Sequence, residues 1–145
     1  MAKILVVNGP NMNLLGTRQP DVYGKRSLEE INERLTMLAK DLGMELVFFQ
    51  SNGEGEIVDF IHEYGAKADG MVINPAAFTH YSYAIRDAID AVGIETIEVH
   101  VTNVFQREEF RHQSVISPVC RGFIAGCGFY GYAMALSYFA DTKTK

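Results

Sequence analysis

The chain has 145 residues, and 13 Lys and Arg against 18 Asp and Glu give it a formal net charge of −5. This length is typical of a single domain, expected here over residues 1–145, with enough chain to bury a core without disulfides or metal. Hydrophobic residues make up 48%, which is typical of a folded protein and argues against disorder. The acidic balance argues against nucleic acid or an anionic membrane as partner, because both select clustered Lys and Arg.

Two cysteines, Cys120 and Cys127, are too few for a disulfide framework and match no zinc-binding spacing. They predict reduced thiols in a cytoplasmic protein, and the N-terminus shows no apolar segment typical of a secretory signal. The uncharged stretch 122–140 approaches the length of a membrane span. Glycines interrupt it, so we expect a buried strand and a buried helix there, and no membrane segment.

Short apolar runs alternate with helical periods along the chain. The predicted strands are 3–8, 45–50, 70–74, 95–101 and 119–124, and the predicted helices are 28–42, a segment after residue 52, 82–91 and 128–139. Ser27 and Glu30 have the spacing of a capping box, and Gly43 suits the end of that helix. This alternation predicts an α/β domain: a flavodoxin-like, doubly wound, five-stranded parallel sheet of order 2-1-3-4-5 with helices on both faces.

In this fold, ligands bind beyond the carboxyl ends of the strands. The connections that leave those ends, 9–26, 75–81 and 102–118, are long, whereas the turn at Gly43 on the opposite edge is tight. Long connections in a compact domain are usually functional. The sequence therefore predicts a site at the carboxyl edge of the sheet.

The first long connection lacks the glycine patterns of dinucleotide and nucleoside triphosphate sites. It contains Asn11, Arg18 and Tyr23, with Gly16 and Gly24 as candidate hinges. A tyrosine is protonated at neutral pH, so it acts as a base only where a cation stabilises its phenolate. The alternative is an ordinary surface loop with a packed tyrosine.

The strand 95–101 places Glu98, His100 and Thr102 on one face. A central parallel strand should be apolar on both faces, so polar residues at these positions predict that the face opens into a site. Glu98 would orient His100 and keep it protonated as an acid. A half-exposed edge strand is the alternative.

Further candidates follow the predicted strands. Asn74 ends a buried strand, where its amide can be held toward a ligand, and His80 could donate to a ligand or cap the next helix. Arg107 and Arg111 would face the same way on a helical turn and could bind a carboxylate, or else form a solvated charge run. No metal-binding spacing or nucleophile elbow occurs. The set suits proton abstraction beside a carbonyl and acid-assisted loss of a leaving group, without metal or cofactor.

Several segments carry a resemblance to a known family: GPNMNLLGTRQPDVYG at 9–24, QSNGEGEIVDFIH at 50–62, INPAAFTHYSYAIRDA at 73–88, EVHVTNVFQREEFR at 98–111 and GFYGYAMAL at 128–136. Over nearly its whole length the chain resembles the type II 3-dehydroquinate dehydratases. The resemblance implies a lyase of the shikimate pathway. It would remove water from 3-dehydroquinate by anti elimination, giving 3-dehydroshikimate through an enolate.

The resemblance also implies roles for individual residues. Tyr23 would be the base, Arg18 would stabilise its reactive state, and Asn11 would orient the group that supports the enolate. His100, held by Glu98, would protonate the departing hydroxyl. The small anionic substrate would be bound by Asn74, His80, Arg111, Arg107 and the backbone of Val101 and Thr102 under a lid at about 17–25, with Asp87 directed toward a neighbouring subunit. The implied assembly is a homo-oligomer of trimers, four of which form a dodecamer.

Some positions depart from the common pattern of that family. Gln19, Phe78, Thr102 and Phe105 stand where Glu, Tyr, Ser and His are common, and Gly53 replaces a frequently larger residue. Thr102 keeps a hydroxyl and a backbone N–H, so we expect binding to survive. The changes at Gln19 and Phe105 are expected to affect lid behaviour or affinity, and none of the departures removes a proposed catalytic group.

Two other classes of function fit the fold. One is a non-enzymatic flavodoxin-like module that binds a small acid or flavin, and the other is a structural oligomer whose Arg and Tyr loops form subunit contacts. Neither requires Glu98 and His100 on one strand face beneath a loop that carries Arg18 and Tyr23.

Overall fold

The computed structural model describes residues 1–144, which form a parallel sheet of order β2-β1-β3-β4-β5. The strands are β1 (Ala2–Asn8), β2 (Met44–Gln50), β3 (Gly70–Asn74), β4 (Thr96–His100) and β5 (Gly122–Ala125). The predicted doubly wound order is confirmed. β1 and β3 lie side by side at the switch point, where a flavodoxin-like fold binds its ligands.

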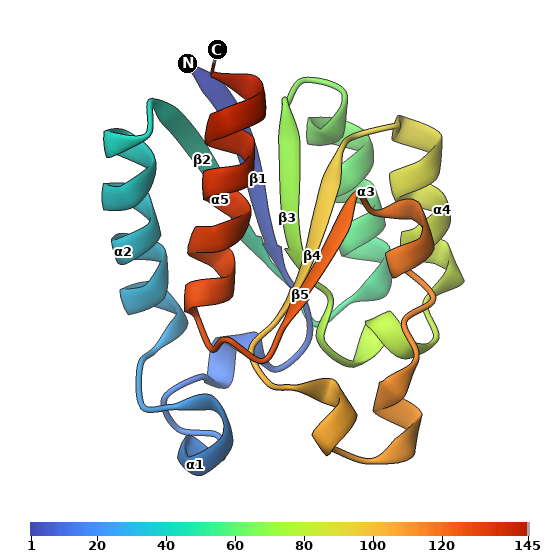
Figure 1. Cartoon of the computed structure of the whole chain (residues 1–145). Coiled ribbons are helices and arrows are strands. Elements are labelled where there is room, and N and C mark those ends of the chain that lie inside the picture. The colour runs from blue at the N-terminus through green and yellow to red at the C-terminus, as the bar shows by residue number, and fades with distance from the viewer. Residues whose placement is uncertain (145) are drawn as a thin grey trace.

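Helices cover both faces of the sheet, as Figure 1 shows. They are α1 (Pro20–Tyr23), α2 (Leu28–Asp41), α3 (Glu54–Gly65), α4 (Tyr83–Val92) and α5 (Tyr130–Lys143). α2 and α5 lie on one face, and α3 and α4 lie on the other. The short α1 stands apart, at the carboxyl edge of the sheet.

The two hydrophobic cores follow from the alternation of side chains along β1. Ile4 and Val6 belong to the core under α2 and α5, whereas Leu5 and Val7 belong to the core under α3 and α4. All four side chains are fully buried. A strand covered on both faces must be apolar at consecutive positions, which explains the run of four apolar residues.

Local signals begin the helices where the sequence places them. The Ser27 hydroxyl accepts a hydrogen bond from the Glu30 N–H at 3.2 Å, as the capping pattern predicts. Ser82 caps α4 in the same way, accepting from the Ile85 N–H at 3.1 Å. His80 is therefore not the cap of α4, and that alternative is wrong.

The fifth strand begins later than predicted. Residues Ser117–Val119 form a 3-10 turn, and β5 pairs with β4 only from Gly122 onward. Pro118 stands at the start of this turn, where its fixed φ and missing N–H favour a turn over a sheet ladder. α5 likewise begins at Tyr130 and not at Gly128, because Gly128 has a left-handed φ of 59°.

The uncharged stretch 122–140 divides into β5, a glycine-containing turn and most of α5. Within residues 1–144, no helix has both the length and the apolar character needed to cross a membrane.

Candidate active site

The carboxyl ends of β1, β3 and β4 surround a cavity of about 70 Å³. Apart from Glu98 and Asp87, all the predicted site residues line it: Asn11, Arg18, Tyr23, Asn74, His80, His100, Val101, Thr102, Arg107 and Arg111. Asn74 and His100 end the strands β3 and β4, and the other residues come from three connections that are far apart in the sequence. The topology brings them together because parallel strands end at the same edge of the sheet.

Glu98 lies directly behind His100, away from the cavity. Its Oε2 is 2.5 Å from Nε2 of His100, and its side chain is fully buried. β4 runs between β3 and β5 with every residue buried, so the edge-strand alternative is wrong. Because Glu98 occupies Nε2, Nδ1 is the ring nitrogen of His100 left for a ligand.

The segment predicted as a lid carries Tyr23 between two guanidinium groups. Cζ of Arg18 lies 4.9 Å from the centre of the Tyr23 ring, and Cζ of Arg107 lies 5.5 Å from it. Gly16 and Gly24 flank the segment with φ values of 91° and 85°, a conformation that favours glycine. Both distances fall within cation–π range, so two positive charges lie beside the Tyr23 ring.

Asn74 is held in one orientation by hydrogen bonds on both sides of its amide. Its Oδ1 accepts from the Ala76 N–H at 3.0 Å, and its Nδ2 donates to the Tyr132 hydroxyl at 3.0 Å. Tyr132 in turn donates to Oδ1 of Asn8 at 2.5 Å. The remaining N–H of Asn74 faces Met12 Sδ at 3.8 Å, a weak contact that a ligand oxygen can replace.

His80 is half-buried, and its Nδ1 lies 2.8 Å from the backbone carbonyl of Gln113. A carbonyl only accepts, so Nδ1 carries the hydrogen and Nε2 is the nitrogen left for a ligand. Desolvation by burial lowers the pKa of His80 below its ordinary value of 6.5, and the hydrogen bond to Gln113 partly opposes it. The neutral ring therefore offers an acceptor at Nε2, whereas the sequence suggested a donor.

Arg107 and Arg111 both line the cavity, but they do not share a helical turn as predicted. Arg107 follows the 3-10 turn Val104–Gln106, and Arg111 lies in the separate turn Glu109–His112. Arg111 Nε donates to Glu108 Oε1 at 3.0 Å, and this bond lowers the pKa of the exposed Glu108 carboxyl. The two charges converge through the path of the connection and not through helical periodicity.

Asp87 lies exposed on α4 and does not line the cavity of its own chain. Nothing in a single chain brings its carboxylate to this site. Its expected contribution to a neighbouring subunit stays a prediction.

Of the positions that depart from the family pattern, Thr102 lines the cavity and the others lie outside its lining. Gln19 precedes α1 with a φ of 41°, and Phe105 is exposed beside His112. Phe78 packs on the core under α3 and α4. A side chain at Gly53 would have its Cβ 2.8 Å from Glu56 Oε1, so a larger residue there would require the Glu56 side chain to move.

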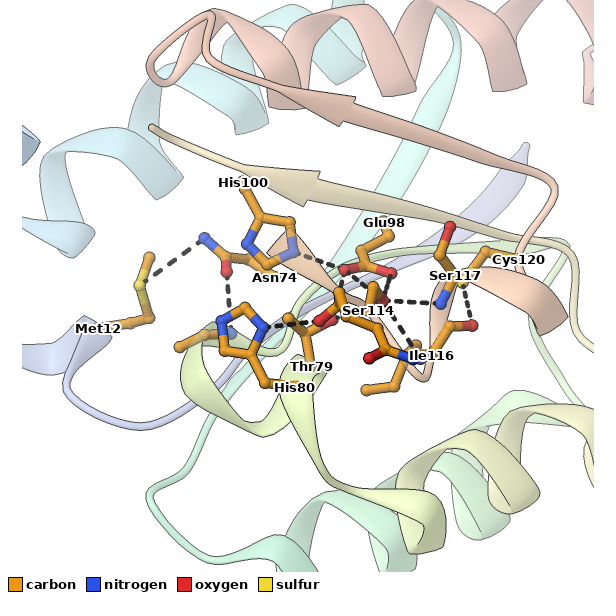
Figure 2. Close-up of polar contacts among 12 residues, drawn as sticks. Met12, Asn74, Thr79, His80, Glu98, His100, Ser114, Ile116, Ser117 and Cys120 are labelled. Carbon is orange, nitrogen blue, oxygen red and sulfur yellow. Dashed lines mark hydrogen bonds and ion pairs between the residues drawn. The ribbon is translucent and has the colours of Figure 1, made fainter. Parts of the chain in front are cut away.

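Reasoning from the sequence missed the residues that hold the others in place. Thr79 and Ser114 bond to the Glu98 carboxylate, and Tyr132 links Asn8 to Asn74 (Figure 2 shows the Glu98 group). The signal available in the sequence was a polar residue within a buried segment, because a buried polar group requires a hydrogen-bond partner. Within residues 1–144, no group of three or more His, Cys, Asp or Glu side chains could hold a metal ion.

Comparison with known proteins agrees with this geometry. The sequence pattern of the family described as "Dehydroquinase class II" matches residues 2–140. The chain is 54% identical to a 3-dehydroquinate dehydratase of Bacillus licheniformis over the full length of both chains. It is 58% identical to one of Pelotomaculum thermopropionicum, covering 92% of this chain and 93% of the relative.

Solved structures give the same result. The type II dehydroquinase of Butyrivibrio crossotus is 51% identical with a TM-score of 0.92, covering 94% of this chain and 96% of that one. The type II dehydroquinase of Propionibacterium acnes is 41% identical with a TM-score of 0.94, covering 97% of both chains. From sequence, fold and site together, the chain belongs to the class II dehydroquinase family.

Proposed function

We propose that this chain is a carbon–oxygen lyase that dehydrates 3-dehydroquinate to 3-dehydroshikimate by anti elimination through an enolate, as a step of the shikimate pathway. Family membership over residues 2–140 and relatives named 3-dehydroquinate dehydratase support the reaction. One observation carries the mechanism: Tyr23, beside two guanidinium groups, lines the same small cavity as His100, which is paired with the buried Glu98.

The first step is removal of a proton from C2 of the substrate by the Tyr23 phenolate. Arg18 and Arg107 stabilise that phenolate by their positive charge. The electron pair of the broken C–H bond moves toward the C3 carbonyl and forms an enolate. Asn11, which lines the cavity, orients the group that supports the enolate oxygen.

The second step is loss of the C1 hydroxyl as water. His100 delivers a proton to the departing oxygen while the enolate electrons form the C1–C2 double bond. Glu98 at 2.5 Å stabilises the imidazolium that this step requires. The net change is loss of one water molecule, so no oxidant, metal or cofactor enters the balance.

The substrate is held by groups that complement its hydroxyls and carboxylate. The Asn74 N–H that faces Met12 donates, His80 Nε2 accepts, and Arg111 supplies a positive charge. The backbone of Val101 and Thr102 receives the carboxylate. Arg107 adds positive potential, which favours binding of an anion within an acidic chain.

The active form is a homo-oligomer in the cytoplasm, with trimers assembling into a dodecamer and Asp87 reaching a neighbouring site. Large exposed aromatic side chains support association: Tyr81, Tyr83, Phe105, Phe110 and Tyr130. Light scattering coupled to gel filtration measures the assembly directly. A monomeric mass for the active enzyme would contradict this assignment.

The reaction is tested by ultraviolet absorbance, because the product has a conjugated double bond that the substrate lacks. We expect absorbance to appear when the purified chain meets 3-dehydroquinate, and to stay absent with Tyr23→Phe. Borohydride added during turnover should leave activity intact, since no lysine among residues 1–144 lines the cavity. Irreversible inactivation would indicate a Schiff base and contradict the mechanism.

A further inference from the structure

The hydroxyl groups of Thr79 and Ser114, neither of which lines the cavity, form hydrogen bonds with the Glu98 carboxylate (Figure 2). Glu98 is fully buried, and within residues 1–144 its ion pair is with His100 and with no Lys or Arg. A buried carboxylate is costly unless hydrogen bonds compensate for the lost water. Thr79 and Ser114 provide that compensation, so the direction in which each hydroxyl points its hydrogen affects the Glu98 carboxylate.

Ser114 can act toward Glu98 only as a donor. A serine hydroxyl has one hydrogen and two acceptor positions. Ser114 Oγ accepts the N–H of Ile116 at 3.2 Å and the N–H of Ser117 at 2.9 Å, which fills both positions. Its hydrogen is left for Glu98, whose Oε1 lies 2.9 Å away.

Thr79 is constrained by Ser114 in turn. Its Oγ1 lies 2.9 Å from Ser114 Oγ, which has no acceptor position left. The Thr79 hydrogen therefore points at Oε2 of Glu98, with which it forms a short hydrogen bond. Thr79 is 1% exposed, so water does not compete for this hydrogen.

The two hydroxyls present only donors to Glu98. Ser114 donates to Oε1 and Thr79 donates to Oε2, which also lies 2.5 Å from His100 Nε2. His100 Nε2 can either donate a hydrogen to Oε2 or accept one from it. Donation from both hydroxyls stabilises negative charge on the carboxylate, which favours the arrangement with the hydrogen on Nε2.

We propose that Ser114 and Thr79 are positioning residues that, by donating to Glu98, keep the proton between Glu98 and His100 on Nε2 of His100, so that the imidazolium can deliver its Nδ1 proton to the departing hydroxyl. The inference rests on the proposed function and assigns these two residues a part in the second step. Neither residue has to touch the substrate. They act on the reaction through the charge that faces Nε2 of His100.

Other charged or titratable groups also face Glu98 and His100. None of the variants compared below changes these groups. They are His80 and Arg111 beside His100, Cys120 behind Glu98, and Arg18, Tyr23 and Arg107 across the cavity. Burial raises the pKa of Cys120 to about 12, so this thiol is neutral near pH 7.

The test measures kcat and KM of the Ser114→Ala enzyme against pH, in the dehydration assay. Without the Ser114 donor, Glu98 is more basic, so the pair binds its proton more tightly and nearer to Glu98. We expect kcat to fall at least about tenfold at neutral pH with KM nearly unchanged. The alkaline limb of the kcat profile should move to higher pH, because the proton leaves the pair later.

Matched variants separate positioning from folding. Ser114→Ala also leaves the N–H groups of Ile116 and Ser117 without an acceptor. Thr79→Val is therefore an independent test, because valine has the shape of threonine but no hydroxyl. The backbone carbonyl of residue 79 still accepts from the Val115 N–H at 2.8 Å. Ser114→Thr and Thr79→Ser retain the hydroxyl donor, so their kcat should depend on pH as that of the wild type does. Ser117→Ala is the control, because Ser117 contributes its backbone N–H to the network.

The outcomes are distinguishable. A purely structural role would lower kcat equally at every pH and leave the alkaline limb in place, which would overturn the inference. If the wild type is active and the alkaline limb of its kcat profile is unchanged in both Ser114→Ala and Thr79→Val, this inference is overturned and the proposed function is not. A wild type that fails to dehydrate 3-dehydroquinate overturns the proposed function, and this inference with it.

Discussion

Oε2 of Glu98 lies 2.5 Å from Nε2 of His100, two residues further along β4, and both side chains are buried. Residues two apart on a strand share a face, so the strand itself sets the spacing of this pair. Because the bond occupies Nε2, the pair presents Nδ1 to the cavity. The acid of the proposed reaction thus has one defined hydrogen-bond partner and one free nitrogen.

Replacing the charge of this pair tests its role. Glu98→Gln keeps the shape but removes the negative charge that stabilises an imidazolium. We expect kcat to fall at least about 100-fold, the lower range for loss of general acid catalysis. Circular dichroism should show an unchanged fold. The double variant with His100→Ala should be no slower than His100→Ala alone, since the two act as a unit, and additive losses would contradict the pairing.

The charges around Tyr23 should control the acidic limb of the kcat profile. A base must lose its proton before it acts, and the Arg18 guanidinium 4.9 Å from the ring favours the phenolate. Arg18→Ala should therefore move the acidic limb to higher pH and lower the rate at neutral pH, while the fold stays intact. Arg18→Lys keeps a charge and should move the limb less. A limb that stays in place in Arg18→Ala would exclude a role on Tyr23.

The hydroxyl of Tyr132 should affect substrate binding although it lies behind the site. Tyr132→Phe removes the hydroxyl that joins Oδ1 of the buried Asn8 to Nδ2 of Asn74, at a cost of about 1–3 kcal/mol in the free energy of unfolding. The Asn74 amide is then held only on its Oδ1 side and by the weak contact with Met12, which should also raise KM. Tyr138→Phe is the control: it removes a hydroxyl of the same helix that donates to Glu95 at 2.7 Å. Urea unfolding and KM measure both effects, and equal KM values in the two variants would contradict the positioning of Asn74.

The burial of His80 should make the free energy of unfolding depend on pH. Burial holds its pKa in the folded chain below the ordinary value of 6.5, so the unfolded chain binds more protons as the pH falls through that value. The contribution of neutral His80 to stability is therefore complete above pH 6.5 and declines below it. His80→Gln should make the free energy of unfolding fall less steeply between about pH 6.5 and 5. Urea unfolding at fixed protein concentration measures this slope, and an identical slope would contradict the shift.

Much of this protein could be predicted from local sequence signals. The alternation of apolar runs with helical periods predicted the strand order, since short parallel βα units leave few topologies. The alternation of polar and apolar residues around Glu98 and His100 predicted their contact, because the two residues lie on one face of a single strand. Ser27 marked the start of α2 through its capping hydroxyl, and Gly43 marked its end because glycine readily adopts a positive φ.

Only the tertiary structure decided which residues hold these groups in place. Tyr132 donates to Asn8 across 124 positions of sequence, and Ser114 reaches Glu98 through an irregular connection. The convergence of Arg107 and Arg111 depended on the path of that same connection, where helical spacing gave the wrong local structure. Local periodicity determines which face a side chain occupies within its own element. Hydrogen-bond partners from distant elements are selected only when folding excludes water, because each buried polar group must then find its partners within the protein.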